Sequence, residues 1–373
     1  MLLLSRGDTW RALRKMMSPT FTSGRLKSMM IPIENLADST IEFIAQKAKE
    51  NPEIDLKPMM QYFSIDVICK VAFGMDTKCR IEEDPEMFKL FTSIMEDFKF
   101  DTYPKATIWA ILSHFPELLS KLGFWPASML KIKTMTKDIM TEREAQNIKI
   151  GDFVDRLMEY KKVAELPITD EMIEAQGMVF MVAGFETTAN TLGSMCYQVA
   201  KHQDVQERIV EEILDNIGSD EITHENISHL EYLEACIMED LRMCSPATDH
   251  ERVCVNDSIV NGIKVKKGVR ILMPITAAHH DPEFFPEPEK FKPERFLKEN
   301  ADKIIPYTWR PFGSGNRVCI GQRFAMMEMK IIIAKLLSKY KLTLTEKSGL
   351  EEVIGSLFLF QYNTSYAKVE LRN

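Results

Sequence analysis

The chain has 373 residues, of which 45% are hydrophobic and 27% are charged. This composition is typical of a globular protein and excludes a disordered or collagen-like chain. The formal net charge is −8, which argues against a nucleic-acid-binding protein, because such proteins need a basic surface to neutralise phosphates. Glycine is scarce, with 16 residues, while Met, Leu, Ile, Lys and Glu are plentiful, so the composition favours helices over an all-β fold.

The beginning of the chain does not resemble a targeting segment. No apolar run reaches the roughly 18 residues that a membrane-spanning helix needs, and Met1–Leu4 is too short for the core of a secretory signal. Trp10, Leu13 and Met17 already follow the stripe of an amphipathic helix. We therefore expect that an N-terminal part of the protein is missing from this chain.

The seven cysteines are odd in number and form no C-x-x-C pair, which argues against a disulfide framework and against a zinc site. We expect reduced thiols in an intracellular compartment, most of them buried as small hydrophobic side chains. The cysteines are Cys69, Cys79, Cys196, Cys236, Cys244, Cys254 and Cys319.

The first part of the chain is predicted to form a series of helices. Apolar residues spaced three and four apart indicate helices near 7–17, 27–49, 58–75 and 86–100. The segment 103–125 is rich in Trp, Phe, Leu and Ile, and two interpretations of it stay open. It forms either a pair of core helices or, near 107–125, a surface that dips into a membrane, where aromatic residues with flanking lysines are favoured.

A long helix is predicted to begin after Thr169, a good N-cap that acidic residues follow, and to run to about Lys201. Its middle, 178–185, is apolar on every face, so we expect it to be buried. Asp204 and Glu207 have the spacing of a capping box at the start of the next helix. Further helices are expected near 228–243 and 320–340.

Strands are predicted in a small part of the chain. Apolar and polar residues alternate over 251–273, and Asn261 with Gly262 supplies the turn of a hairpin there. Short strands are also expected at 342–345 and 368–371. The strand-rich part is therefore small beside the helices.

Between the predicted strands, 281–318 is a long irregular stretch that proline and glycine punctuate, and a loop of this length is usually functional. Just before it, His279 and His280 could suggest a metal site, but no third ligand is placed, so we expect a hydrogen-bonded pair near a loop. Because the sequence has no internal repeat and no linker, we expect residues 1–373 to form one mainly α unit with a small β part.

The glycine-rich stretch 311–321 leads directly into a predicted helix. Its glycines would let the backbone approach a flat, bulky group closely. Cys319 would lie at the helix start, where free N–H groups stabilise a thiolate, and a thiolate ligand on iron is how some haem proteins drive O–O cleavage. Arg317 could pair with a haem carboxylate. The alternative is an ordinary buried cysteine after a turn.

Five positions in this stretch match the haem-binding signature of the cytochrome P-450 family, and a chance match is on the order of 10⁻⁴. They are Phe312, Gly315, Arg317, Cys319 and Gly321. The chain therefore resembles this family, and the resemblance implies an iron protoporphyrin with Cys319 as the metal ligand and Phe312, Arg317 and Gly321 as cofactor-binding residues. It also implies that 307–340 holds the haem-thiolate loop and the helix after it.

Two further motifs extend the resemblance. Glu239 and Arg242 lie three apart on one helix face; alone they are usually a solvated pair, but they resemble the family's E-x-x-R element. Arg295, in Pro-Glu-Arg-Phe, resembles the third member of that triad, with a structural role behind the haem. Trp10-x-x-x-Arg14 and Arg252 resemble contacts to the haem propionates, a task suited to arginine.

The segment 183–188, Ala-Gly-Phe-Glu-Thr-Thr, resembles the family's A-G-x-[DE]-T-T oxygen-activation motif. From the residues alone, Gly184 would open space and the Thr187 hydroxyl would bond back to a backbone carbonyl, although a simple polar interruption of a buried helix is the alternative. The resemblance implies that Ala183 contacts the haem and that Glu186 and Thr187 relay protons to iron-bound oxygen. It also implies pocket residues at Phe180, Ala183, Ala247 and Leu357.

The segments 18–27 and 251–254 resemble the animal microsomal group that includes drug- and steroid-oxidising enzymes. The resemblance implies a mainly α fold with a small β part, at the cytosolic face of the endoplasmic reticulum membrane. It further implies monooxygenation of an apolar substrate (a steroid, lipid or xenobiotic) by O₂, with NADPH electrons from a flavoprotein reductase, because no G-x-G-x-x-G follows a strand in this chain.

The family's N-terminal segment, with its membrane anchor, first strands and pocket-roofing helix, is absent from the sequence before Trp10. The chain is therefore expected to be a fragment, an alternative product or an incomplete gene model. Two other functions stay open: an isomerase or dehydratase of the same family, and a catalytically inactive haem-binding product. Thr187 argues against the first, since a monooxygenase needs that relay.

Overall fold

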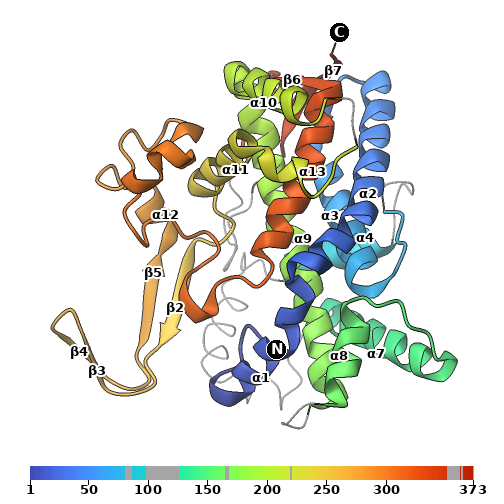
Figure 1. The fold of residues 1–373 in the computed structure, drawn as a ribbon, viewed down its shortest axis with the longest axis vertical. Coiled ribbons are helices and arrows are strands. Elements are labelled where there is room, and N and C mark those ends of the chain that lie inside the picture. Colours follow the sequence, from blue (N-terminus) through green and yellow to red (C-terminus); the bar gives the residue numbers. More distant parts are fainter. Residues whose placement is uncertain are drawn as a thin grey trace.

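The computed structural model describes residues 1–79, 86–97, 126–163, 168–218, 221–350, 362 and 364–372. Within these residues the protein is mainly helical with three small antiparallel sheets, as the sequence predicts. Figure 1 shows the long helix α9 (Asp170–Lys201) running through the middle of the helices, while a narrow arm of strands projects to one side. The predictions for 103–125 and for Leu357 lie outside the described residues.

The predicted helices are present in their predicted order, and the structure adds helices at 127–146, 153–161 and 275–279, where none was predicted. In the first half they are α1 (Gly7–Met17), α2 (Ser23–Glu50), α3 (Leu56–Phe73), α4 (Glu86–Asp97), α7 (Ala127–Gln146) and α8 (Phe153–Lys161). After α9 come α10 (Gln203–Asn216), α11 (Glu231–Met243), α12 (Ile275–His279) and α13 (Gln322–Lys339). In the part of the chain that the structure describes, no helix is both long and apolar enough to cross a membrane.

Helix α9 begins as predicted. The side chain of Thr169 accepts a hydrogen bond from the Met172 N–H at 3.2 Å, which satisfies one of the free donors at the helix start. The predicted capping box of α10 is wrong, because that helix begins after His202 with no side-chain cap. Glu207 instead forms ion pairs with Arg372 at 2.6 Å and with Lys341, so it holds the C-terminal sheet.

The strands form one sheet among the helices and two ladders in the projecting arm (Figure 1). The sheet among the helices has the order β1–β7–β6, from β1 (Glu53–Asp55), β7 (Tyr366–Leu371) and β6 (Tyr340–Thr343). The arm consists of β2 (Asp249–Val253) paired with β5 (Arg270–Pro274), and of the hairpin β3 (Ser258–Val260) and β4 (Ile263–Val265). Asn261 and Gly262 have φ angles of 48° and 79°, so the predicted hairpin turn is confirmed.

The Glu239–Arg242 pair is buried rather than solvated. Neither side chain has exposed surface, and Arg242 Nε and Nη2 lie 2.7 and 3.0 Å from the two Glu239 carboxylate oxygens. Arg242 also donates to the carbonyls of His279 and Pro288, at 2.8 and 2.7 Å. Arg295 completes the predicted triad, with its Nε 3.3 Å from Glu239. The pair thus joins α11 to the irregular stretch that precedes the cysteine loop.

Replacing Arg242 should unfold the protein far more readily than replacing an exposed cation. Arg242→Ala leaves the Glu239 carboxylate buried and unpaired, so we expect a loss of about 3–5 kcal/mol in the free energy of unfolding. Lys266→Ala, which removes an exposed ion pair with Asp257, should cost far less. Urea denaturation followed by circular dichroism measures both, and equal losses would contradict the structural role given to Arg242.

Candidate functional site

Cys319 lies in a tight loop immediately before α13. Its backbone N–H donates to the Phe312 carbonyl at 2.8 Å, and the Val318 N–H donates to the Gly315 carbonyl at 3.0 Å. Gly313 and Gly315 have φ angles of +78° and +66°, in the left-handed region that side chains disfavour. The glycine pattern therefore produces a compact loop that presents a cysteine.

The sulfur of Cys319 faces the start of α13. Burial raises the pKa of the Cys319 thiol, while the backbone N–H groups of Gly321 and Gln322 and the charge of Arg14 act to lower it. The predicted stabilisation by the helix start is present, but desolvation outweighs it in the free thiol. Cys319 nevertheless keeps exposed surface, whereas four of the other cysteines are buried: Cys69, Cys79, Cys196 and Cys236.

Arginines from separate parts of the chain converge beside the cysteine loop. Arg14 on α1 donates from Nη1 to the Val318 carbonyl at 2.8 Å. Arg317 donates from Nη2 to the Ser5 carbonyl at 2.9 Å, and its guanidinium carbon lies 4.1 Å from the centre of the Trp10 ring. Figure 1 shows the same arrangement, with α1 beside the segment that leads into α13.

The charges of these arginines repel one another. Burial, together with repulsion from Arg252, Arg14 and Arg6, lowers the pKa of the Arg317 guanidinium. Arg252 on β2 donates to the carbonyl of its neighbour Glu251 at 2.8 Å. Over the described ranges, no carboxylate forms an ion pair with Arg14, Arg252 or Arg317. Such a cationic cluster suits an anionic group that carries carboxylates.

One face of α9 presents Ala183 and Thr187. Ala183 is exposed, and the Thr187 hydroxyl donates to the Ala183 carbonyl at 2.6 Å, which is the predicted back-bonding. The interpretation of Gly184 as an opening is wrong. A Cβ atom at Gly184 would lie 2.6 Å from Ile68 Cδ1 of α3, so this glycine permits close packing of two helices.

Glu186 is held by α3. Its side chain is almost fully buried, with Oε2 accepting from Gln61 Nε2 at 3.1 Å and Oε1 lying 3.8 Å from Lys57 Nζ. Lys57 is itself buried, so the two charges form a desolvated pair between α3 and α9. The structure thus separates the environments of the two predicted catalytic residues, with Thr187 beside an exposed position and Glu186 among buried partners.

Lys57 and Gln61 were not among the predicted site residues. They are spaced four apart near the start of a mostly apolar helix, so they share one face of α3. A lysine and a glutamine on a buried face each need a polar partner. That spacing was the available signal, but nothing in the sequence pointed to Glu186 as the partner.

Phe180 does not share the surroundings of Ala183. It is nearly buried, and its ring stacks between Phe153 of α8, at a centroid distance of 4.2 Å, and Phe21, at 5.7 Å. A Cβ at Gly321 would in turn lie 3.9 Å from Phe21, so this aromatic stack backs the cysteine loop. Phe180 therefore packs in the core, and its expected place in a substrate pocket is not supported. Ala247 is half-buried.

Comparison with known proteins agrees with this geometry. The family model described as Cytochrome P450 matches residues 1–368. The chain belongs to the cytochrome P450 family. It is similar to Cytochrome P450 3A11 of Mus musculus, with 33% identity over 346 residues that cover 90% of this chain and 68% of that protein. It is also similar to Cytochrome P450 3A6 of Oryctolagus cuniculus, with 31% identity over 367 residues, or 96% and 73% of the two chains.

The protein is thus a cytochrome P450 monooxygenase, and its family implies a haem-thiolate cofactor. The described residues fit such a group in two respects. Cys319 lies at the start of α13 with part of the residue exposed, and over the described ranges no acid forms an ion pair with Arg14, Arg252 or Arg317. A haem has both a metal that takes a thiolate and two carboxylates that need cations.

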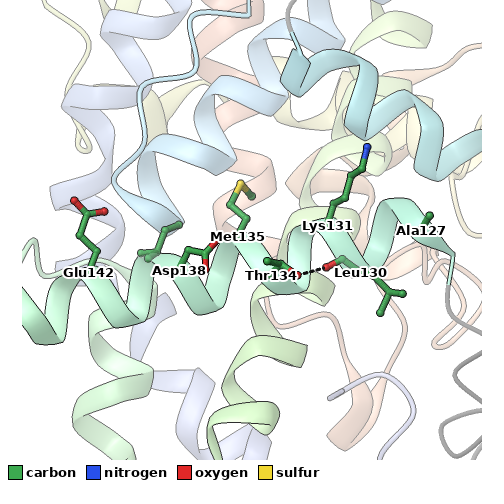
Figure 2. Close-up of a pocket in the computed structure, with 8 residues that line it drawn as sticks. Ala127, Leu130, Lys131, Thr134, Met135, Asp138 and Glu142 are labelled. Carbon is green, nitrogen blue, oxygen red and sulfur yellow. Dashed lines mark hydrogen bonds between the residues drawn. The ribbon is translucent and has the colours of Figure 1, made fainter.

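An open pocket among the described residues lies elsewhere in this P450. It has a volume of about 560 Å³ and runs along α7, and Figure 2 shows side chains of that helix, including Lys131, Asp138 and Glu142, lining it. None of the residues predicted to take part in the chemistry lines this cavity. The same described part of the chain holds no cluster of three or more His, Cys, Asp or Glu side chains suited to a metal.

A buried acid on the helix that follows Cys319 lies near α9. Glu328 on α13 is 1% exposed, and among the described residues neither of its carboxyl oxygens has a hydrogen-bond partner within normal distance. Burial raises the pKa of Glu328 to about 8, and the nearby Thr188 hydroxyl counteracts this only in part. Glu328 is therefore protonated in the folded protein at neutral pH.

This burial should make stability depend on pH in a defined direction. The pKa of Glu328 is raised from 4.5 to about 8, so the unfolded chain releases this proton first, and stability falls between those values. The slope is about 1.4 kcal/mol per pH unit, and no further loss is expected above the folded-state pKa. Glu328→Gln should remove this contribution. The stability of the variant relative to the parent should therefore be greater at about pH 8 than at about pH 5.

Urea denaturation at both pH values, with the exposed Glu346→Gln as the control, measures the effect of Glu328. The control should follow the parent protein at both values, because Glu346 is exposed. A stability difference between parent and Glu328→Gln that stays constant with pH would show that Glu328 ionises normally.

Proposed function

We propose that this P450 inserts one atom of O₂ into an apolar organic substrate (a steroid, lipid or xenobiotic) and reduces the other to water. The electrons would come from NADPH through a flavoprotein reductase. The observation that carries the proposal is Cys319 at the start of α13, beside arginines that form no ion pair with an acid in the described part of the chain. The similarity to P450 3A proteins supports a place at the endoplasmic reticulum membrane.

Cys319 would be the iron ligand, and Arg14, Arg252 and Arg317 would hold the haem carboxylates, with Trp10 beneath the Arg317 guanidinium. A thiolate-ligated haem supplies the redox chemistry of O–O cleavage. The protein contributes the N–H groups of Gly321 and Gln322 that face the sulfur and so stabilise its negative charge. Ala183 and Phe312 would border the cofactor.

Thr187 and Glu186 would handle protons. The Thr187 hydroxyl donates to the Ala183 carbonyl, which orients the lone pairs of its oxygen away from the helix backbone. Glu186 is held between Gln61 and Lys57, so a proton that it exchanges must pass through this buried polar group or through water. Lys57 and Gln61 are thus positioning residues for the acid.

Cys319→Ser should abolish thiolate ligation while leaving the fold intact. Serine keeps the size of the side chain but offers a hydroxyl, which is not a comparable donor to iron. We expect the reduced, carbon monoxide-treated variant to lack the long-wavelength Soret band of thiolate-ligated haem. Cys254→Ser, at a half-buried cysteine on the projecting arm, should retain it. Retention of the band in Cys319→Ser would assign the iron ligand to another residue.

Thr187→Ala should uncouple electron consumption from product formation. We expect the product formed per NADPH to fall by on the order of 10²-fold, because a positioned proton relay contributes at least that much. Thr187→Ser keeps the hydroxyl and is the matched control. Turnover with a reductase and a hydrophobic test substrate measures both, and an unaffected Thr187→Ala would contradict the proton-relay role given to Thr187.

A further inference from the structure

His279, at the end of α12, has no exposed surface, and both of its ring nitrogens have partners. Its Nε2 lies 3.1 Å from the backbone N of Arg310, and its Nδ1 lies 3.2 Å from the Arg242 carbonyl oxygen. A backbone N–H can only donate, so Nε2 accepts and Nδ1 carries the proton that it donates to Arg242. The two bonds fix one neutral tautomer of His279.

His279 is also bound through its own backbone. Its carbonyl accepts a hydrogen bond from Arg242 Nη1 at 2.8 Å, so these two residues are joined in both directions. Arg242 in turn is held by Glu239. A continuous series of buried hydrogen bonds therefore runs from the Glu239 carboxylate to the Arg310 peptide.

The cysteine loop begins at the Arg310 peptide. The Arg310 carbonyl accepts from the Gly313 N–H at 3.0 Å, and two residues after Arg310 the Phe312 carbonyl accepts from the Cys319 N–H. Over the described ranges no backbone carbonyl accepts a hydrogen bond from the Arg310 N–H, and the ring of His279 is its acceptor. The placement of Cys319 thus depends on a peptide that a histidine side chain holds.

We propose that His279 is a positioning residue that fixes the start of the cysteine loop to the Glu239–Arg242 pair and so keeps Cys319 in place to ligate iron. This inference rests on the proposed function. Burial lowers the pKa of His279 to about 3, and the neighbouring charges of Arg242 and Arg310 act in the same direction. His279 therefore stays neutral at physiological pH and serves as a fixed connection.

Two conservative variants distinguish the two hydrogen bonds that the His279 ring makes. His279→Gln can place an amide oxygen near the position of Nε2 and retain the acceptor for Arg310. His279→Asn can place an amide donor near the position of Nδ1 and retain the bond to Arg242, but it leaves the Arg310 N–H buried without a partner. If the inference is correct, His279→Asn disturbs the loop and His279→Gln does not.

The haem-loaded variants are compared in two measurements. The ratio of thiolate-ligated to total bound haem, from reduced carbon monoxide spectra, should fall about tenfold in His279→Asn, which corresponds to about 1.4 kcal/mol. It should stay near that of the parent in His279→Gln. Hydrogen exchange of the peptide covering 310–319, followed by mass spectrometry, should also be about tenfold faster in His279→Asn alone, and this readout does not depend on the haem ligand.

Ile209→Ala, in the buried face of α10, is the control for a general loss of stability. It should lower the unfolding midpoint without changing either readout. A normal ratio and normal exchange in His279→Asn, or the same losses in Ile209→Ala, would overturn the inference. A parent protein without the thiolate band would instead contradict the proposed function, while the exchange measurement would still show whether His279 holds the loop.

Discussion

Arg242 is a fully buried cation, and a charge in that environment is tolerated only when its donors are satisfied. Its guanidinium meets the Glu239 carboxylate and the carbonyls of His279 and Pro288, which ties α11 to the irregular stretch after α12. Through His279 the same network reaches the first peptide of the cysteine loop. The residues around Cys319 are therefore linked by hydrogen bonds to residues far from it in the sequence.

The site itself combines groups whose charges remain uncompensated within the described protein. Arginines from α1, β2 and the cysteine loop repel one another, and burial adds to the cost of their charges. Cys319 has N–H donors aimed at its sulfur, yet desolvation raises its pKa. Under the proposed function, an anionic cofactor that binds a thiolate, such as the haem that the cytochrome P450 family implies, would offset both costs. Binding of such a group would therefore stabilise the folded protein.

Local patterns predicted much of this arrangement. The left-handed glycines and the cysteine at a helix start are local features, so the signature around Cys319 could be found without a structure. The Thr169 cap and the turn at Asn261 are local in the same sense. Pairings between distant segments could not be predicted from spacing. Glu207 fits a capping box in sequence but binds Arg372, and Gly184 and Phe180 pack against neighbouring elements.

The central claim is that this chain assembles a haem-thiolate site around Cys319. The most direct test is the visible spectrum of the purified protein, supplied with haem, reduced and exposed to carbon monoxide. The account predicts the long-wavelength Soret band that thiolate-ligated haem gives, with one haem bound per chain. A folded protein that binds no haem, or that binds it without this band, would contradict the account.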